Sequence, residues 1–166
     1  MKPNVRMARP GDEPEMLRLI HALASYEHEA DAVKATTETL RESFFGENPQ
    51  AFAHVAEYQG RIVGTAIWFF NYSTWTGRKG IYLEDLFVDE QVRGLGVGRA
   101  LFRALARRAL DEDCARIDWA VLDWNTPAMA FYRHIGGRRA SGWQPWRLEG
   151  DAIAALADEG CLPAAR

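Results

Sequence analysis

Residues 91–99 read Gln91-Val92-Arg93-Gly94-Leu95-Gly96-Val97-Gly98-Arg99, with glycine at every second position from 94 to 98. The segment follows an apolar run that ends near Val88 and precedes a helical pattern that starts near Arg99. Alternating glycines let backbone N–H groups point into one concavity without Cβ atoms in the way. The next helix adds its first amides and the positive end of its dipole. The segment therefore predicts a phosphate or pyrophosphate site, to which Arg93 and Arg99 add charge-assisted contacts.

Other glycine motifs fit this segment less well. A Walker loop needs Gly-Lys-Ser/Thr, whereas Gly98 is followed by Arg99 and Ala100. The dinucleotide fingerprint needs Gly-x-Gly-x-x-Gly in an early βαβ unit, and the glycines here are spaced Gly-x-Gly-x-Gly, late in the chain. A purely structural turn is the remaining alternative, and three glycines with Gln91 and two arginines at one strand–helix junction argue against it.

The whole chain predicts one α+β domain with a mostly antiparallel sheet flanked by helices. The Gln59-Gly60 pair indicates a hairpin, and residues 71–80 are expected to form a loop. Strands are expected at 5–9, 52–58, 62–70, 81–88, 116–122 and 143–149. Helices are expected after a cap at Asp12 up to 26, and at 36–45, 99–109, 126–136 and 151–157.

Composition excludes several classes of protein. The chain has 166 residues, 48% of them hydrophobic and 26% charged, which are values typical of a globular domain. No apolar run approaches the roughly 20 residues of a membrane span, and the start lacks a signal-peptide core, so a cytosolic protein without membrane partners is expected. A net charge of −3 argues against nucleic acid. Cys114, Cys161 and four scattered histidines show no disulfide framework or metal-ligand spacing.

The glycine segment matches the Gln/Arg-x-x-Gly-x-Gly/Ala signature of the Gcn5-related N-acetyltransferases, which bind the pyrophosphate of acetyl-coenzyme A. Further segments resemble the diamine and thialysine (spermidine/spermine-type) N-acetyltransferases of that superfamily. They are 72–77 (Tyr-Ser-Thr-Trp-Thr-Gly), 82–85 (Tyr-Leu-Glu-Asp), Asn125-x-Pro127 with Phe131-Tyr132, and Trp146-Arg147-Leu148. The match runs from about Val5 to about Ala157. It implies a single GNAT domain over 1–166, with its core at about 5–157 and a splayed cofactor cleft.

The resemblance implies where acetyl-CoA, the cosubstrate, is bound. Backbone groups of Leu86, Phe87 and Val88 would align the pantetheine arm and polarise the acetyl carbonyl. The pyrophosphate would be held by Arg93, Gly94, Leu95, Gly96, Val97, Gly98 and Arg99. Asn125 would contact the cofactor near its thioester. The family works by direct transfer, so neither cysteine is needed as a nucleophile, and no metal is expected.

Two residues are candidates for proton transfer. Tyr132 matches the family tyrosine that protonates the leaving thiolate, and packing beside Phe131 is the alternative. Glu84 is assigned by the resemblance to acceptor binding and to relaying a proton from the amine, with Asp85 as a second acceptor-site carboxylate. In a regular strand these two acids point to opposite faces, so at most one would face the cleft. A buried salt bridge to an arginine is the structural alternative, because unpartnered buried carboxylates are costly.

The expected acceptor is the primary amine of a small cation. Tyr26 and Glu27 match subfamily positions that line the acceptor site, and Glu27, Glu29 and Asp31 form an acidic cluster whose alternative is a solvated helix end. Trp75 offers a cation–π face or ordinary packing.

A diamine, a polyamine or a thialysine-like amine fits this description. Gln144 stands where the polyamine enzymes have a carboxylate, which favours a smaller diamine or a lysine-like amine. Aminoglycoside or protein-amine acetylation, and a non-catalytic acyl-CoA-binding module, stay open. The resemblance also implies a homodimer, because the C-terminal strand of the subfamily, which contains Trp146-Arg147-Leu148 here, crosses to the partner.

Overall fold

A computed structural model describes residues 2–158 of the chain, so Cys161 lies outside the described residues. Its sheet has the strand order β1-β2-β3-β4-β5, in which β1 to β4 are antiparallel and β5 runs parallel to β4. The strands are β1 (Asn4–Met7), β2 (Phe52–Tyr58), β3 (Arg61–Ser73), β4 (Arg78–Val88) and β5 (Ile117–Trp119). The predicted α+β class with a mostly antiparallel sheet is confirmed.

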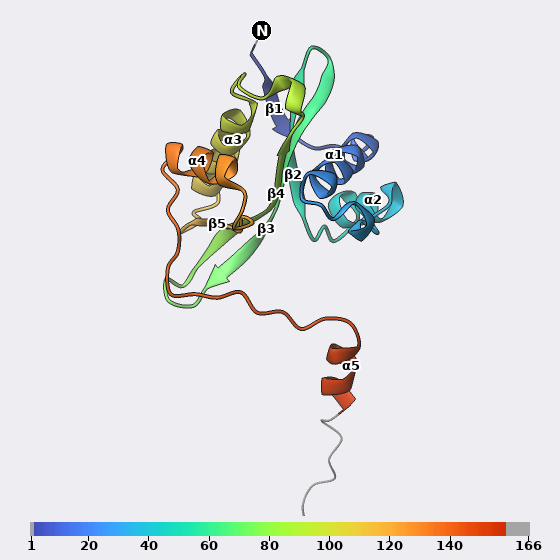
Figure 1. Cartoon of the computed structure of the whole chain (residues 1–166), viewed down its shortest axis with the longest axis vertical. Helices are drawn as coiled ribbons and strands as arrows, with labels where there is room; N and C mark the ends of the chain where they lie inside the picture. The colour runs from blue at the N-terminus through green and yellow to red at the C-terminus, as the bar shows by residue number, and fades with distance from the viewer. Residues whose placement is uncertain (1, 159–166) are drawn as a thin grey trace, which may run out of the picture. The chain divides into compact units, whose positions relative to one another are not determined.

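Helices cover both faces of this sheet. Helices α1 (Glu13–Tyr26) and α2 (Thr37–Phe45) lie on one face and α3 (Val97–Asp111) lies on the other (Figure 1). Two short 3₁₀ helices, η1 (Ala30–Ala32) and η2 (Glu90–Val92), lie in the connections. These elements belong to one compact unit that extends to Thr126.

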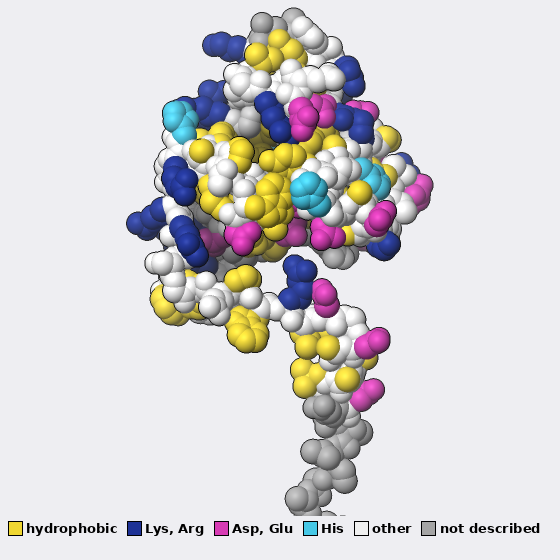
Figure 2. Space-filling model, viewed as in Figure 1, with side chains coloured by type: hydrophobic (Ala, Val, Ile, Leu, Met, Phe, Trp, Pro, Cys, Tyr) yellow, Lys and Arg dark blue, Asp and Glu magenta, His cyan; other side chains and the backbone are white. Residues whose placement is uncertain are grey.

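A second unit begins at Pro127 and contains most of α4 (Thr126–His134) together with α5 (Asp151–Asp158). Its exposed side chains include large apolar ones around α5 and in the segment before it (Figure 2). They are Trp143, Trp146, Leu148, Ile153 and Leu156. None of the described helices is long and apolar enough to cross a membrane.

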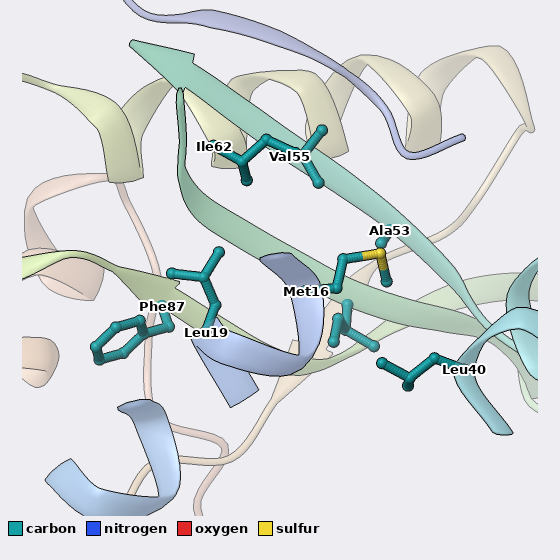
Figure 3. Packing of buried hydrophobic residues seen from close by; sticks show 8 residues of the cluster. Met16, Leu19, Leu40, Ala53, Val55, Ile62 and Phe87 are labelled. Carbon is teal, nitrogen blue, oxygen red and sulfur yellow. The ribbon is translucent and has the colours of Figure 1, made fainter. Parts of the chain in front are cut away.

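The main core lies between the sheet and the α1–α2 layer (Figure 3). Met16 and Leu19 of α1 and Leu40 of α2 pack against the side chains of three strands. The strand members of the cluster are Ala53, Val55, Ile62, Ile67 and Phe87. At about 25 cal/mol per Å² of buried apolar surface, this packing is the main stabilising contribution to the fold and fixes the position of α1 against β4.

The helix boundaries follow the expected signals with one correction. The Thr36 side chain accepts the Thr39 N–H in a capping box, and α2 ends before Gly46 as predicted. Asp12 occupies the N-cap position of α1, but its side chain makes no capping hydrogen bond. Its carboxylate accepts hydrogen bonds from Arg6 at 2.6 and 3.0 Å and from the Arg9 N–H at 2.9 Å, so it joins β1 to the start of α1.

Three strand predictions need correction. Residues 71–80 are not a loop, because Tyr72 pairs with Lys79 and only residues 74–77 turn; cross-strand pairing outweighs local turn propensity here. Strand β5 covers 117–119 instead of 116–122 because its partner β4 leaves regular register after Leu83. Residues 143–149 form no strand, since a strand needs a hydrogen-bonded neighbour and the described sheet ends at β5.

Candidate active site

The candidate site is built around an irregularity in β4. Ile67 of β3 pairs with Asp85, and the next residue, Trp68, pairs with Leu83, so Glu84 is an extra residue in a β-bulge. Tyr82 pairs with Phe69, which lies on the same face of β3 as Ile67. Glu84, two residues after Tyr82, therefore points to the face that Asp85 also occupies. The expectation that at most one of the two acids faces the cleft is wrong, because it assumed a regular strand.

The end of α1 brings a third carboxylate to this face. Burial, together with the smaller effect of the neighbouring charges of Glu84 and Glu27, raises the pKa of the half-buried Asp85 to about 6. Burial also raises the pKa of Glu27. No ion pair with a basic side chain involves Glu27, Glu84 or Asp85 within residues 2–158. We call these three residues the acidic face. The structural alternative, a buried salt bridge from Glu84 or Asp85 to an arginine, is not formed among residues 2–158.

The other two acids of the predicted cluster lie elsewhere. Glu29 and Asp31 are exposed, before and within η1, and neither contributes to the raised pKa of Asp85. The structure therefore brings only Glu27 of that cluster to the carboxylates of β4.

Beyond the bulge, one edge of β4 has no neighbouring strand among residues 2–158. Pairing with β5 stops at Leu83, opposite Trp119, while pairing with β3 continues to Val88. The backbone groups of Leu86, Phe87 and Val88 on the β5 side thus face an open part of the sheet. The Phe87 side chain is buried in the α1–α2 layer, so these residues offer their backbone and not their side chains.

The glycine segment has the backbone geometry that an anion site requires. Gly94 and Gly96 have φ values of +82° and +81°, and no atom lies within 4 Å of the Cβ position at either residue. Gly96 is the N-cap of α3. Within the described chain, no backbone acceptor takes the N–H of Gly94, Gly96, Val97 or Gly98. These free donors at a helix N-terminus fit a pyrophosphate group.

The two arginines of this segment differ in their surroundings. The Arg93 guanidinium lies 5.1 Å from the Tyr26 ring and 5.5 Å from the Phe87 ring, and its Nε donates to the Val88 carbonyl at 3.1 Å. Arg93 therefore lies at the junction of the glycine segment, β4 and α1. Arg99 is exposed in the first turn of α3.

Two residues predicted for different ligands contact each other. The Tyr26 hydroxyl donates to Asn125 Oδ1 at 3.2 Å, and Asn125 is only 8% exposed. Tyr26 was expected at the acceptor and Asn125 at the cofactor. Their hydrogen bond joins the end of α1 to the segment before α4.

Sequence reasoning missed an aromatic group beside Glu27. The ring of Trp124 lies 5.8 Å from that of Tyr26 and 5.6 Å from that of His28. His28 adopts a φ of +65°, which is uncommon for a residue other than glycine. The signal available in the sequence was that Trp124 opens the segment Trp124-Asn125-Thr126-Pro127, which resembles the family, but the resemblance assigned Trp124 no role at the site.

Trp75 and Tyr132, two further predicted residues, lie in other elements of the chain. Trp75 is 87% exposed in the turn between β3 and β4, and the stretch from Arg78 to Glu84 alone spans about 20 Å at the rise of a strand. Tyr132 lies in α4 of the second unit, with its ring 5.6 Å from that of Phe131. Among residues 2–158, no group of three or more His, Cys, Asp or Glu side chains is placed to hold a metal ion.

Comparison with known proteins identifies the class to which this site belongs. The sequence model of the Acetyltransferase (GNAT) family matches residues 15–136. The chain belongs to this family, and it is an N-acetyltransferase.

Named relatives narrow the resemblance. The chain is 43% identical over 164 residues to the thialysine N-epsilon-acetyltransferase of Sus scrofa. The aligned region covers 92% of this chain and 96% of that relative. The Bos taurus protein of the same name gives the same identity and coverage. A solved integron cassette protein from Vibrio cholerae has a TM-score of 0.79 at 24% identity, covering 95% of this chain and 98% of that one, which shows the common fold.

Proposed function

We propose that this N-acetyltransferase moves an acetyl group from acetyl-CoA directly to a primary amine of a small cationic acceptor. The observation on which this proposal rests is the acidic face of Glu27, Glu84 and Asp85, with which no basic side chain of residues 2–158 forms an ion pair. Three carboxylates held together at a cost in free energy favour a ligand that supplies positive charge.

The glycine segment and the free edge of β4 would hold acetyl-CoA. Four unpaired N–H groups, from Gly94 to Gly98, suit the pyrophosphate, and Arg99 would add charge. Backbone groups of Leu86, Phe87 and Val88 would align the pantetheine arm, with Leu95 and Val97 framing the loop and Asn125 near the thioester. When bound, acetyl-CoA supplies the acetyl group and a thiolate leaving group.

Arg93 has a second role in this proposal. Because its guanidinium contacts both Tyr26 and the Val88 carbonyl, it would couple the position of the pyrophosphate to that of the acceptor wall.

The acidic face would bind the amine and accept its proton. An alkylamine with a pKa of about 10.4 is almost wholly protonated at neutral pH, so its nitrogen must lose a proton before it attacks. Glu84, exposed on β4, would take that proton directly or through an ordered water. Asp85 and Glu27 would hold the second cationic end, and the rings of Tyr26 and Trp124 would line its path.

Tyr132 would protonate the departing thiolate. A phenol has a pKa of about 10 and a thiol one of about 8.5, so this transfer is feasible from a positioned tyrosine. The match of Tyr132, seven positions after Asn125, to the family tyrosine supports this role.

The acceptor would be a lysine-like amine or a short diamine. Relatives at 43% identity are named for thialysine, and Gln144 replaces a carboxylate expected for long polyamines. Trp75 is too distant along the β3–β4 hairpin to contact the acidic face of its own subunit, so it would meet only the far end of an acceptor or another surface.

We also propose a homodimer in which the whole chain, 1–166, is one domain with its core at about 5–157. Residues 143–149 have strand-like sequence but are not part of the sheet formed within residues 2–158, and Trp143 and Trp146 are 75% and 91% exposed. A second subunit would supply the partner strand and cover these rings.

A panel of acceptors tests the proposed activity. The protein would be incubated with acetyl-CoA and thialysine, lysine, a short diamine, spermidine, an aminoglycoside or a lysine-containing peptide, and thiol release followed with a disulfide reagent. We expect the highest kcat/KM for thialysine or the diamine. Turnover only with the aminoglycoside or the peptide would refute the acceptor class, and binding of acetyl-CoA without any turnover would refute the activity.

A further inference from the structure

A cavity lies on the face of the sheet opposite to the acidic face. It has a volume of about 290 Å³ and is formed where α3 crosses β1 and β2. Val5, Met7 and Ala104 provide an apolar wall, and His54 lies among the lining residues. The volume equals that of about ten molecules of liquid water, so the cavity suits a small ligand.

His54 presents a single free donor to this cavity. Its side chain is 94% buried, being only 6% exposed, and its Nδ1 accepts the Trp68 indole N–H at 3.1 Å. Burial and the nearby charge of Arg108 lower the pKa of His54 to about 4, so the ring is neutral at pH 7. A neutral imidazole whose Nδ1 accepts has its proton on Nε2. No described residue accepts that proton, so the Nε2–H group is left for the cavity.

Arg108 adds a second unsatisfied donor. Its Nε is buried without a hydrogen-bond partner in the described chain, while its terminal nitrogen pairs with Glu112 at 2.7 Å. Buried donors without acceptors are rare in folded proteins, because an unpaired buried donor loses its hydrogen bonds to water without replacement. The buried Arg108 Nε, together with the Nε2–H group of His54, indicates that a hydrogen-bond acceptor is missing at this cavity.

The charged residues of the cavity indicate what net charge its ligand would carry. Arg6 is already neutralised by Asp12 and Glu57, both at 2.6 Å. Arg107 lines the cavity and has no ion pair within residues 2–158. Asp111 also lines the cavity, and its negative charge opposes any anionic ligand, a dianion more strongly than a monoanion. The site therefore favours a monoanion over a dianion.

We propose that this cavity binds a small aliphatic carboxylate, whose oxygens accept from His54 Nε2–H and Arg108 Nε–H. Arg107 balances its charge, and its short apolar tail contacts Val5, Met7 and Ala104. The site is separate from the proposed acetyl-CoA site, because the helix from Gly96 to Arg107 is about 16 Å long at 1.5 Å per residue. Carboxylate binding here would be a function beyond acetyl transfer. This proposal does not depend on which amine the enzyme acetylates.

The test is a butyrate titration of the full-length protein, followed by NMR of the His54 imidazole and the Trp68 indole N–H. We expect saturable shifts of both signals with butyrate and none with butyramide, its neutral counterpart. Arg107→Gln is expected to weaken butyrate binding about tenfold, as for loss of a charge-assisted contact. Arg103→Gln changes an exposed arginine of the same helix that does not line the cavity, and is expected to bind butyrate like the parent.

Three results would overturn the proposal. They are the absence of saturable shifts, equal binding of butyramide, and an equal effect of the two arginine substitutions. Inorganic phosphate that binds more tightly than butyrate at matched ionic strength would overturn the choice of a carboxylate. Acetyl transfer should be unchanged in both variants, because neither arginine belongs to the proposed acetyl-transfer site.

Discussion

Glu84 and Asp85 occupy one β-bulge opposite Ile67, so two consecutive carboxylates lie on the same face of β4. A regular strand would separate them, and the bulge brings them together beside Glu27 at the end of α1. The same irregularity coincides with the end of pairing between β4 and β5. One backbone feature thus creates both the acidic face and the open edge proposed for the pantetheine arm.

Neutralising Asp85 should stabilise the protein at neutral and alkaline pH. Its pKa of about 6 in the folded protein lies above the ordinary value of 3.8, so the folded state binds the proton more tightly. Stability from this group is complete below pH 4 and is lost as the pH rises through about 6. A shift of one pKa unit corresponds to about 1.4 kcal/mol. The free energy of unfolding of Asp85→Asn should therefore exceed that of the parent by about 1–3 kcal/mol at pH 8 and equal it at pH 4.

Urea unfolding at pH 4, 6 and 8 measures this difference. Glu57→Gln is the control of opposite sign, because hydrogen bonds from Arg6 and Asn4 lower the pKa of Glu57, and its removal should destabilise the protein above pH 4. An Asp85→Asn protein less stable than the parent at pH 8 would mean that Asp85 has a stabilising partner.

Gly96→Ala should weaken acetyl-CoA binding by tenfold or more. Gly96 has a φ of +81° and an open Cβ position, so the new methyl group meets the space proposed for the pyrophosphate. Gly60→Ala is the matched control, with a φ of +77° and an equally open Cβ position in the β2–β3 turn. Each substitution costs about 1–2 kcal/mol of backbone strain, so both should lower Tm alike. Titration calorimetry that finds equal cofactor affinity in the two variants would refute the loop assignment.

Tyr132→Phe should lower kcat by roughly 10²–10⁴, the range for loss of a positioned acid. Phenylalanine keeps the ring and its contact with Phe131, so Tm and acetyl-CoA affinity should change little. Steady-state kinetics with the best acceptor gives the comparison, and Phe131→Leu serves as a packing control with kcat near that of the parent. A fully active Tyr132→Phe enzyme would show that water or the substrate amine protonates the thiolate.

The homodimer should depend on the exposed tryptophans of the second unit. Sedimentation at micromolar concentration should give twice the 18.7 kDa mass of the chain. Trp146→Asp would place a charge where an apolar contact is proposed and should shift the distribution toward the monomer. The exposed Trp75→Asp is the comparison, since Trp75 lies in the β3–β4 turn. A parent protein that sediments only as 18.7 kDa would refute the dimer.

The sequence predicted the parts of the fold that local patterns determine. The hairpin at Gln59-Gly60, the helix from Thr37 to Phe45 and the glycine segment before α3 all follow local rules of turn chemistry, capping and periodicity. The long β3–β4 ribbon and the shortened β5 depend on pairing between distant residues, and propensity gave no sign of either.

The sequence singled out the residues of the acidic face, but it did not predict their geometry. The motif Tyr82-Leu83-Glu84-Asp85 identified the carboxylates, whereas their common face depends on the register of β3 against β4. The contact between Tyr26 and Asn125 joins positions far apart in the chain, so only the packing of α1 reveals it.

The central claim is that the acidic face selects a cationic acceptor, and a pair of acceptors tests it most directly. We would measure kcat/KM for a short diamine and for the alkylamine of the same length, in the parent, Glu27→Gln and Glu29→Gln. Glu29 is the control because it is exposed and does not affect Asp85. We expect the parent and Glu29→Gln to prefer the diamine by about tenfold or more, as for one paired charge, and Glu27→Gln to lose most of that preference. Equal kcat/KM for the two amines in the parent would contradict the account.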